Sequence, residues 1–197
     1  MNILGIIFAL AAGVFFGIIG PVTKTAYNLG AGVGLAIFLR YIVALLIVSP
    51  LIPYQRNLFK TYRNNFKLFL LITVASIMLT TGLLISVTYI NVSLTIIIFC
   101  TYPIIVLTIS VFVTKEKIKK IIKFLFISTF IGLFLALSPS TESLKVQGII
   151  FALIASLGAS IMIVTNQTMS KKNISPIEIN IFINFFNTIF FLVILSL

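Results

Sequence analysis

The chain has 197 residues, of which 60% are hydrophobic and 9% are charged, and its formal net charge is +11. So much apolar material excludes a soluble globular domain, because a soluble fold of this length needs a larger polar surface than these residues can supply. There is no His, a single Cys and no pair of neighbouring carboxylates, so the residue patterns of common catalytic and metal sites are missing. We therefore predict a membrane protein that is not an enzyme and needs no cofactor.

Seven apolar runs follow one another along the chain, and each is close to the length of about 20 residues that a helix needs to cross a bilayer. They fall at roughly 3–22, 33–53, 66–88, 91–113, 121–138, 146–166 and 178–197. Strands of a membrane barrel would alternate polar and apolar residues, whereas these runs are apolar on all sides. The sequence therefore predicts an all-α, polytopic membrane helix bundle.

The Lys and Arg residues predict the orientation of these spans. Only Lys24 and Lys145 fall in the first, third and fifth loops. The second, fourth and sixth loops carry eleven: Arg56, Lys60, Arg63, Lys67, Lys115, Lys117, Lys119, Lys120, Lys123, Lys171 and Lys172. Because positive loops stay on the cytoplasmic side, we predict a cell (inner or plasma) membrane protein with a cytoplasmic N-terminus. The positive charge then reports topology, and no nucleic-acid partner is expected.

The hexapeptide GIIFAL occurs twice, at residues 5–10 and 148–153. Small residues continue each copy at four-residue spacing: Gly5, Ala9, Gly13 and Gly17 in the first, and Gly148, Ala152, Ser156 and Ser160 in the second. Five spans separate the copies, so the second enters the membrane from the opposite side, as in the inverted repeats of secondary transporters. Small residues allow close helix contact or leave room beside a cavity. Apolar composition and the ordinary preference for small residues at helix contacts are the alternative explanation.

Arg40 is the most informative single residue, because it lies about 10 Å into its predicted helix at 1.5 Å per residue. A cation at that depth is costly unless it faces water, protein or an anion. It is therefore a candidate to bind a carboxylate or phosphate of a solute, or else a structural arginine that bonds to backbone carbonyls or snorkels outward. Lys24 is either a second anion contact or a snorkelling residue. Gly20 and Pro21 before it predict an interrupted helix end.

Two further segments contain candidate binding residues. Pro103 removes one intrahelical hydrogen bond in the middle of the run 91–113, so a freed carbonyl beside Tyr102 could line a cavity; a plain kink is the alternative. Three amides lie three or four residues apart in the last run: Asn180, Asn184 and Asn187. We expect their face to look into protein or a cavity, with Asn184 as a substrate-binding candidate. Outside the helix ends there is no carboxylate to carry a coupling proton.

Four segments in chain order resemble the EamA-like family of the drug/metabolite transporter superfamily. They are Gly17 followed by Lys24, the stretch GLAIFLRYIVALLIV with Arg40, the stretch YINVSLTIIIFCTYPIIVLTISVFVTKEK with Pro103 and Glu116, and SPIE at Ser175–Glu178.

The resemblance implies ten helices in two inverted five-helix repeats. Residues 1–138 would then be the first repeat and residues 146–197 the first two helices of the second, so we expect the second repeat to be incomplete. It also implies that Glu116 pairs with a basic residue when an inner gate closes, although local charge balance explains that residue equally well. Gly13 and Gly17 are the other predicted gating or structural residues.

Our leading prediction is a transporter that moves a small metabolite by alternating access around a cavity in the middle of the membrane, with an anionic group of the solute on Arg40. Its partners would be the lipid bilayer and that solute. One alternative is a non-transporting or half-size membrane subunit that acts only in an assembly, for which a homodimer is one form. The other is a multidrug efflux protein with an aromatic-lined cavity.

Overall fold

The computed structural model describes residues 3–54, 58–114, 127–129, 131–132, 135 and 145–196, and within these ranges it contains helices and no strand. Six segments of that part are long and apolar enough to cross a membrane: Gly5–Asn28, Val33–Pro53, Phe66–Tyr89, Val92–Ile109, Val146–Lys171 and Pro176–Ser196. The predicted all-α, polytopic membrane bundle is therefore confirmed. The predicted run 121–138 falls mostly on residues outside the described ranges.

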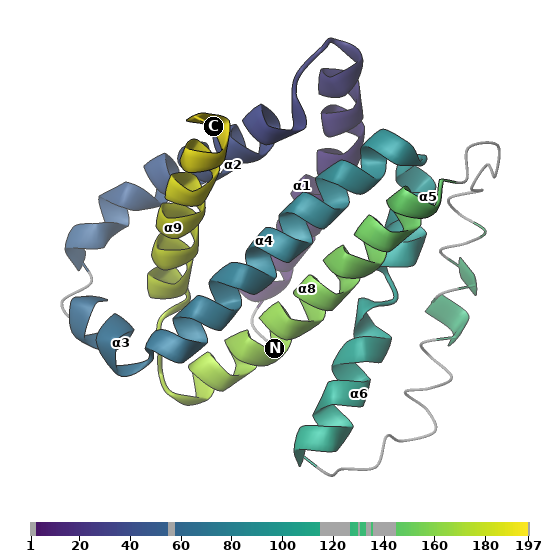
Figure 1. The fold of residues 1–197 in the computed structure, drawn as a ribbon. Helices are drawn as coiled ribbons and strands as arrows, with labels where there is room; N and C mark the ends of the chain where they lie inside the picture. Colours follow the sequence, from purple (N-terminus) through teal and green to yellow (C-terminus); the bar gives the residue numbers. More distant parts are fainter. Residues whose placement is uncertain are drawn as a thin grey trace.

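The described elements follow in chain order (Figure 1). They are α1 (Ile3–Asn28), α2 (Val33–Val48), the 3-10 helix η1 (Ser49–Tyr54), α3 (Leu58–Asn64), α4 (Phe66–Tyr89), α5 (Val92–Phe99), α6 (Tyr102–Thr114), α8 (Val146–Lys171) and α9 (Pro176–Ser196). Gly30 has a φ of +92° in the tight turn between α1 and α2, a conformation that only glycine adopts readily. The chain therefore reverses direction there.

The interruption that we predicted at Gly20 and Pro21 is wrong. α1 continues through Pro21 to Asn28. A proline removes a single backbone N–H, and a long helix in an apolar medium keeps its other hydrogen bonds on both sides of the gap. The hydroxyl of Thr25 also donates to the carbonyl of Pro21 at 3.1 Å. The helix therefore ends at the Gly30 turn and not at the proline.

The predicted run 91–113 is divided into two helices. α5 ends at Phe99 and α6 begins at Tyr102, so Pro103 occupies the first turn of α6 and does not kink the middle of a helix. A proline is well tolerated at that place, because the N–H groups of a first turn have no intrahelical partner. The break lies at Cys100 and Thr101, two to three residues before the proline.

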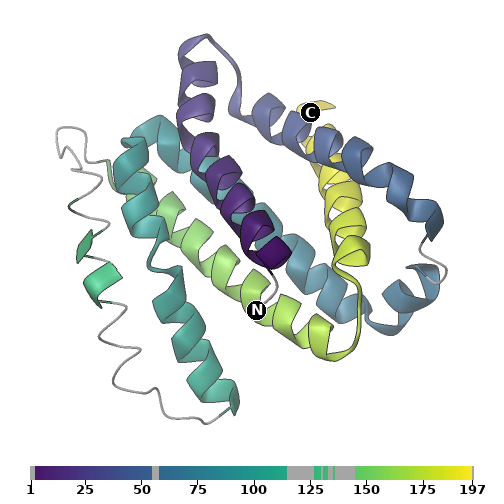
Figure 2. The same ribbon diagram turned by 180° about the vertical axis from the view of Figure 1, so that it is seen from behind.

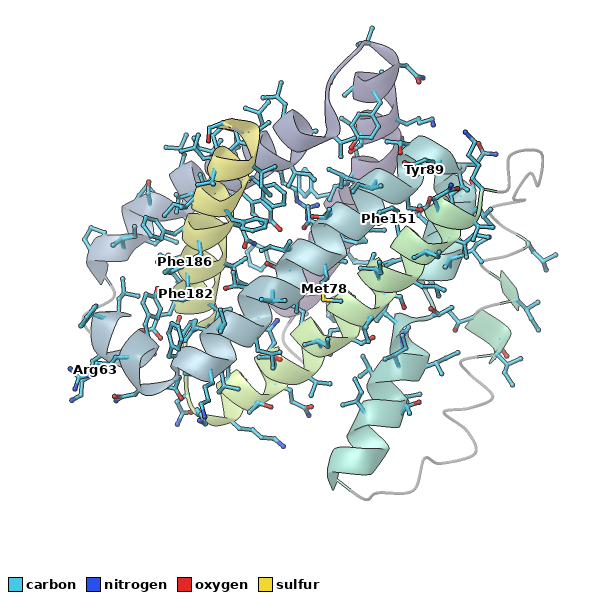
Figure 3. All side chains as sticks on the ribbon, viewed as in Figure 1. Arg63, Met78, Tyr89, Phe151, Phe182 and Phe186 are labelled. Atoms are coloured by element: carbon cyan, nitrogen blue, oxygen red, sulfur yellow. The ribbon has the colours of Figure 1, made fainter. Side chains whose placement is uncertain are left out.

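Helices α4 and α8 form the centre of the bundle and run antiparallel side by side (Figure 1). Two glycines permit this close approach. A Cβ on Gly82 would lie 2.6 Å from the carbonyl oxygen of Phe151, and a Cβ on Gly158 would lie 2.7 Å from that of Ala75. Both distances are too short for any side chain, so the two backbones touch. Further along the same pair, the rings of Tyr89 and Phe151 stack at 6.3 Å (Figure 3).

Helices α2 and α9 pack on the other side of α4, and a chain of buried hydrogen bonds joins all three. The hydroxyl of Tyr41 donates to Thr80 Oγ1 at 2.8 Å, and the amide of Asn187 donates to Ser76 Oγ at 2.6 Å. Asn187 is fully buried. The expectation that the amide face of the last helix points inward therefore holds for Asn187 and Asn184, but Asn180 is exposed.

Helix α1 crosses α4 behind it in Figure 1 and in front of it in Figure 2, and it runs in the direction opposite to α8. The two GIIFAL helices differ in their surroundings. Gly148, Ala152, Ser156 and Ser160 of α8 are buried. In contrast, Gly5, Gly13 and Gly17 of α1 are exposed, and a Cβ on any of them would meet nothing within 4 Å. Among the described residues of the two stripes, close helix contact is thus found for those of α8 and not for Gly5, Gly13 or Gly17.

The substitution Gly158→Val should destabilise the bundle by about 1–3 kcal/mol or more, because the added side chain must push α4 away from α8. Gly13→Val is the matched control, since it adds the same side chain to a membrane helix at a position with open space. Thermal unfolding of the purified protein in detergent measures both. Equal melting temperatures for the two variants would contradict the close contact between α4 and α8.

Candidate functional site

A cavity of about 280 Å³ lies among helices α1, α2, α4, α5 and α6. Its lining is mostly apolar and aromatic: Phe16, Gly17, Ile19, Gly20, Thr23, Arg40, Leu83, Leu84, Val87, Val92, Thr95, Ile96, Phe99, Cys100 and Tyr102. The volume is at the lower end of the range of roughly 300–1,000 Å³ that is usual for small-molecule sites, which are also mostly apolar with a few polar groups.

Arg40 is the one charged residue among the described residues that line this cavity. It makes no hydrogen bond or ion pair with any residue in the described part of the chain. The neighbouring hydroxyl of Tyr41 points elsewhere, to Ser76 and Thr80. A guanidinium has five donors and cannot lose its charge in a protein, so it needs acceptors inside an apolar medium. Arg40 is therefore placed to bind an anion or water in the cavity.

Aromatic and hydroxyl side chains complete the wall. The ring of Phe99 lies 5.2 Å from that of Tyr102 and 6.0 Å from that of Phe16. Thr95 also lines the cavity, and its hydroxyl shares a hydrogen bond of 3.0 Å with that of Ser86 on α4, which does not line the cavity. The phenol group of Tyr102 has no hydrogen-bond partner among the described residues and can meet a polar group of a ligand. This combination suits an organic molecule with an apolar body and an anionic end.

Lys24 does not line the cavity. Its ammonium donates a hydrogen bond of 2.9 Å to the carbonyl oxygen of Val87, in the last turn of α4. Val87 itself does line the cavity, so Lys24 fastens the end of α1 to the helix that forms one wall. This position differs from both sequence-based interpretations, because the charge neither snorkels freely nor reaches the cavity.

The break between α5 and α6 is held in place by α8. The hydroxyls of Thr101 and Ser156 lie 2.9 Å apart, and the hydroxyl of Ser160 donates to the carbonyl of Tyr102 at 3.0 Å. Both bonds tie the residues around the break to a neighbouring helix. These bonds fix the place of Tyr102 in the cavity wall. Sequence reasoning did not find them, although Ser156 and Ser160 lie on the small-residue stripe that it identified.

The cavity contains three of the residues predicted from sequence, Arg40, Tyr102 and Gly17. It does not include Pro103, Gly13 or Asn184. The amide of Asn184 donates to the carbonyl of Asn180 in the same helix at 2.8 Å. Glu116 lies outside the described residues. Sequence reasoning missed the contributions of Thr23, Thr95 and Cys100, because isolated Thr and Cys residues in an apolar run give no signal of their own.

A bundle of several membrane-crossing helices, with a cavity lined by a cation that has no partner among the described residues, indicates a multi-pass membrane protein of the transporter class. The family model of the EamA-like transporter family matches residues 3–138. The chain therefore belongs to the EamA-like transporter family, and every residue of the cavity lies within the matched range. No curated protein and no solved structure matches the chain.

Cys100 lines the cavity and is the chain's one cysteine, so it can report the electrostatics around Arg40 without further engineering. We expect water-soluble methanethiosulfonate reagents to label it. The ratio of the rate with an anionic reagent to the rate with a cationic one should fall several-fold in Arg40→Gln, because the positive charge attracts anions into the cavity. Mass spectrometry of the intact protein measures the labelling.

A lipid-facing thiol serves as the control for this labelling. Leu39 precedes Arg40 at nearly the same depth, is 48% exposed and does not line the cavity. The double variant Cys100→Ala, Leu39→Cys should therefore resist both reagents, since thiolates do not form in hydrocarbon. A rate ratio at Cys100 that is the same with and without the Arg40 charge would contradict the assignment of Arg40 to the cavity.

Proposed function

We propose that the protein transports a small organic anion, and that the anionic group binds Arg40 while the rest of the molecule lies against the aromatic wall of the cavity. The observation that carries this proposal is the position of Arg40, which lines the cavity about halfway along the apolar helix α2 and has no partner among the described residues. A bound carboxylate or phosphate would make charge-assisted hydrogen bonds to the guanidinium. The volume of about 280 Å³ favours a metabolite over a polymer or a large drug.

Transport by alternating access is the mechanism we propose. Two features support it: α1 and α8 carry the same hexapeptide in opposite directions, and a helix break next to Pro103 lies in the wall of the cavity. Broken helices and inverted repeats are common in carriers that rock around a central site. The division into repeats at 1–138 and 146–197 remains a prediction. So does a cytoplasmic N-terminus, which rests on the distribution of Lys and Arg.

Efflux of lipophilic cations is a second candidate, because Phe16, Phe99 and Tyr102 offer aromatic faces that attract cations. The charge of Arg40 in the same cavity opposes it. An unpaired guanidinium repels a cationic drug in an apolar medium, where charges are poorly screened. We therefore favour an anionic solute.

Ligand-induced stabilisation tests the proposal before the solute is known. A ligand that binds only the folded state raises the melting temperature, so pools of dicarboxylates, phosphorylated metabolites, amino acids and lipophilic cations can be screened. We expect a hit among the anions, and proteoliposomes loaded with the labelled hit should then show transport.

The variant Arg40→Gln should weaken binding and uptake about 10–100-fold, the effect of losing a charged hydrogen bond of about 1.5–3 kcal/mol. Arg40→Lys should retain part of both.

Lys24→Gln is the matched control, since it also removes one positive charge but from outside the cavity. Its melting temperature without ligand should drop, because the bond to Val87 is lost, while the shift caused by the ligand stays. A full ligand-induced shift in Arg40→Gln, or hits among the lipophilic cations alone, would contradict transport of an anion.

A further inference from the structure

A groove of about 450 Å³ runs between the short helix α3 and the first half of α9, on the outer surface of the bundle. Its walls are aromatic: Phe59, Phe66 and Phe186 are exposed, whereas Phe182 is buried at its base. Figure 3 shows Phe182 and Phe186 on α9, and Arg63 at the outer end of α3. The groove is separate from the cavity that contains Arg40, because the two share no lining residue.

The base of the groove is a rigid cluster of rings. The ring of Tyr62 packs against those of Phe69 and Phe182, each at 4.7 Å, and Phe182 lies 4.3 Å from Phe186. The hydroxyl of Tyr62 is used in a hydrogen bond of 3.0 Å to the carbonyl of Glu178. No polar group of the described residues other than Arg63 faces the groove unpaired, so it can accept a hydrocarbon chain but not a polar peptide or sugar.

One end of the groove is cationic. Arg63 belongs both to the groove and to an adjoining cationic pocket of about 550 Å³, which also contains Lys67 and Lys172. None of the described residues that line this pocket is acidic. Glu178 on α9 is buried. Its carboxylate accepts a hydrogen bond from the backbone N–H of Ser175, the residue just before α9 begins. The groove and this pocket share Arg63 and Phe66, so the charges of Lys67 and Lys172 adjoin the apolar groove next to the charge of Arg63.

We propose that this groove binds a phospholipid with an anionic headgroup, with an acyl chain along the aromatic side chains and the phosphate on Arg63 and Lys67. The two parts of the site match the two parts of such a lipid. The apolar groove can hold the acyl chain, and the adjoining cationic pocket can hold the phosphate. Arg and Lys at such positions bind anionic lipid headgroups. A free phosphate would leave Phe59 and Phe66, which are 80% and 57% exposed, without a partner. A lipid covers both parts at once.

Lipid titration of the purified protein in detergent tests the proposal, with melting temperature and native mass spectrometry as the two readouts. Phosphatidylglycerol should bind more tightly than phosphatidylcholine with the same acyl chains. The preference should fall about five-fold or more in Arg63→Gln, in Lys67→Gln and in the double variant. Phe186→Ala should weaken both lipids alike, because it shortens the apolar wall without changing the charge.

Lys171→Gln is the charge-matched control, since Lys171 is exposed at the same end of the bundle but lines neither the groove nor the cationic pocket. It should keep the full preference. Equal binding of the two lipids would overturn the proposal, and so would equal effects of the Arg63 and Lys171 substitutions. If glycerol 3-phosphate alone stabilises the protein as much as phosphatidylglycerol, the site binds a free anion and the lipid assignment is wrong. Neither readout uses the transport cavity, so these outcomes are independent of the proposed transport.

Discussion

The backbone contact between α4 and α8 is the interaction on which the rest of the structure depends. Lipid tails are as apolar as Leu side chains, so helices in a membrane gain little from burying apolar surface and associate mainly through close packing and hydrogen bonds. Gly82 and Gly158 bring the two backbones together at separations that no other residue would allow. The α4–α8 pair then serves as the support for the helices on both sides of it.

Each side of this pair holds one part of the transporter in place. On one side, Ser156 and Ser160 of α8 secure the break between α5 and α6, while Leu83, Leu84 and Val87 of α4 form a wall of the cavity. On the other side, the hydrogen bonds that Tyr41 and Asn187 donate to α4 secure α2 and α9. Arg40 lies one residue before Tyr41, so the bond of Tyr41 to Thr80 sets the rotation of α2 that turns Arg40 to the cavity.

The sequence predicted the features that follow from hydropathy and from the cost of burying charge. Six of the predicted spans and the membrane class follow from the rule that a backbone in lipid must form its own hydrogen bonds, which favours helices. The choice of Arg40 as a candidate follows from the cost of placing a cation in an apolar helix, and Arg40 does line the cavity. The family resemblance, which rested on four short segments, is confirmed over residues 3–138. Tyr102 was identified because a proline follows it, and the residue does line the cavity, although the proline lies in the first turn of a new helix.

What the sequence could not predict depends on how helices are rotated and paired. Whether the ammonium of Lys24 reaches a cavity or the carbonyl of Val87 depends on where α1 lies relative to α4, which no local pattern encodes. Likewise, Asn184 and Asn187 share an inward face, but only the second meets a partner on another helix among the bonds that the structure records. The positions of helix ends could not be read from the prolines either, because Pro21 lies inside α1 whereas Pro103 lies near the start of α6.

An experimental structure of the protein in lipid, determined with the anion that stabilises it most, would show whether Arg40 binds the solute. We predict density for the ligand with an acceptor atom about 3 Å from the guanidinium of Arg40, enclosed by α1, α2, α4, α5 and α6. Density that instead shows the guanidinium bonded to protein carbonyls or to a carboxylate of the chain, with the ligand elsewhere, would contradict it.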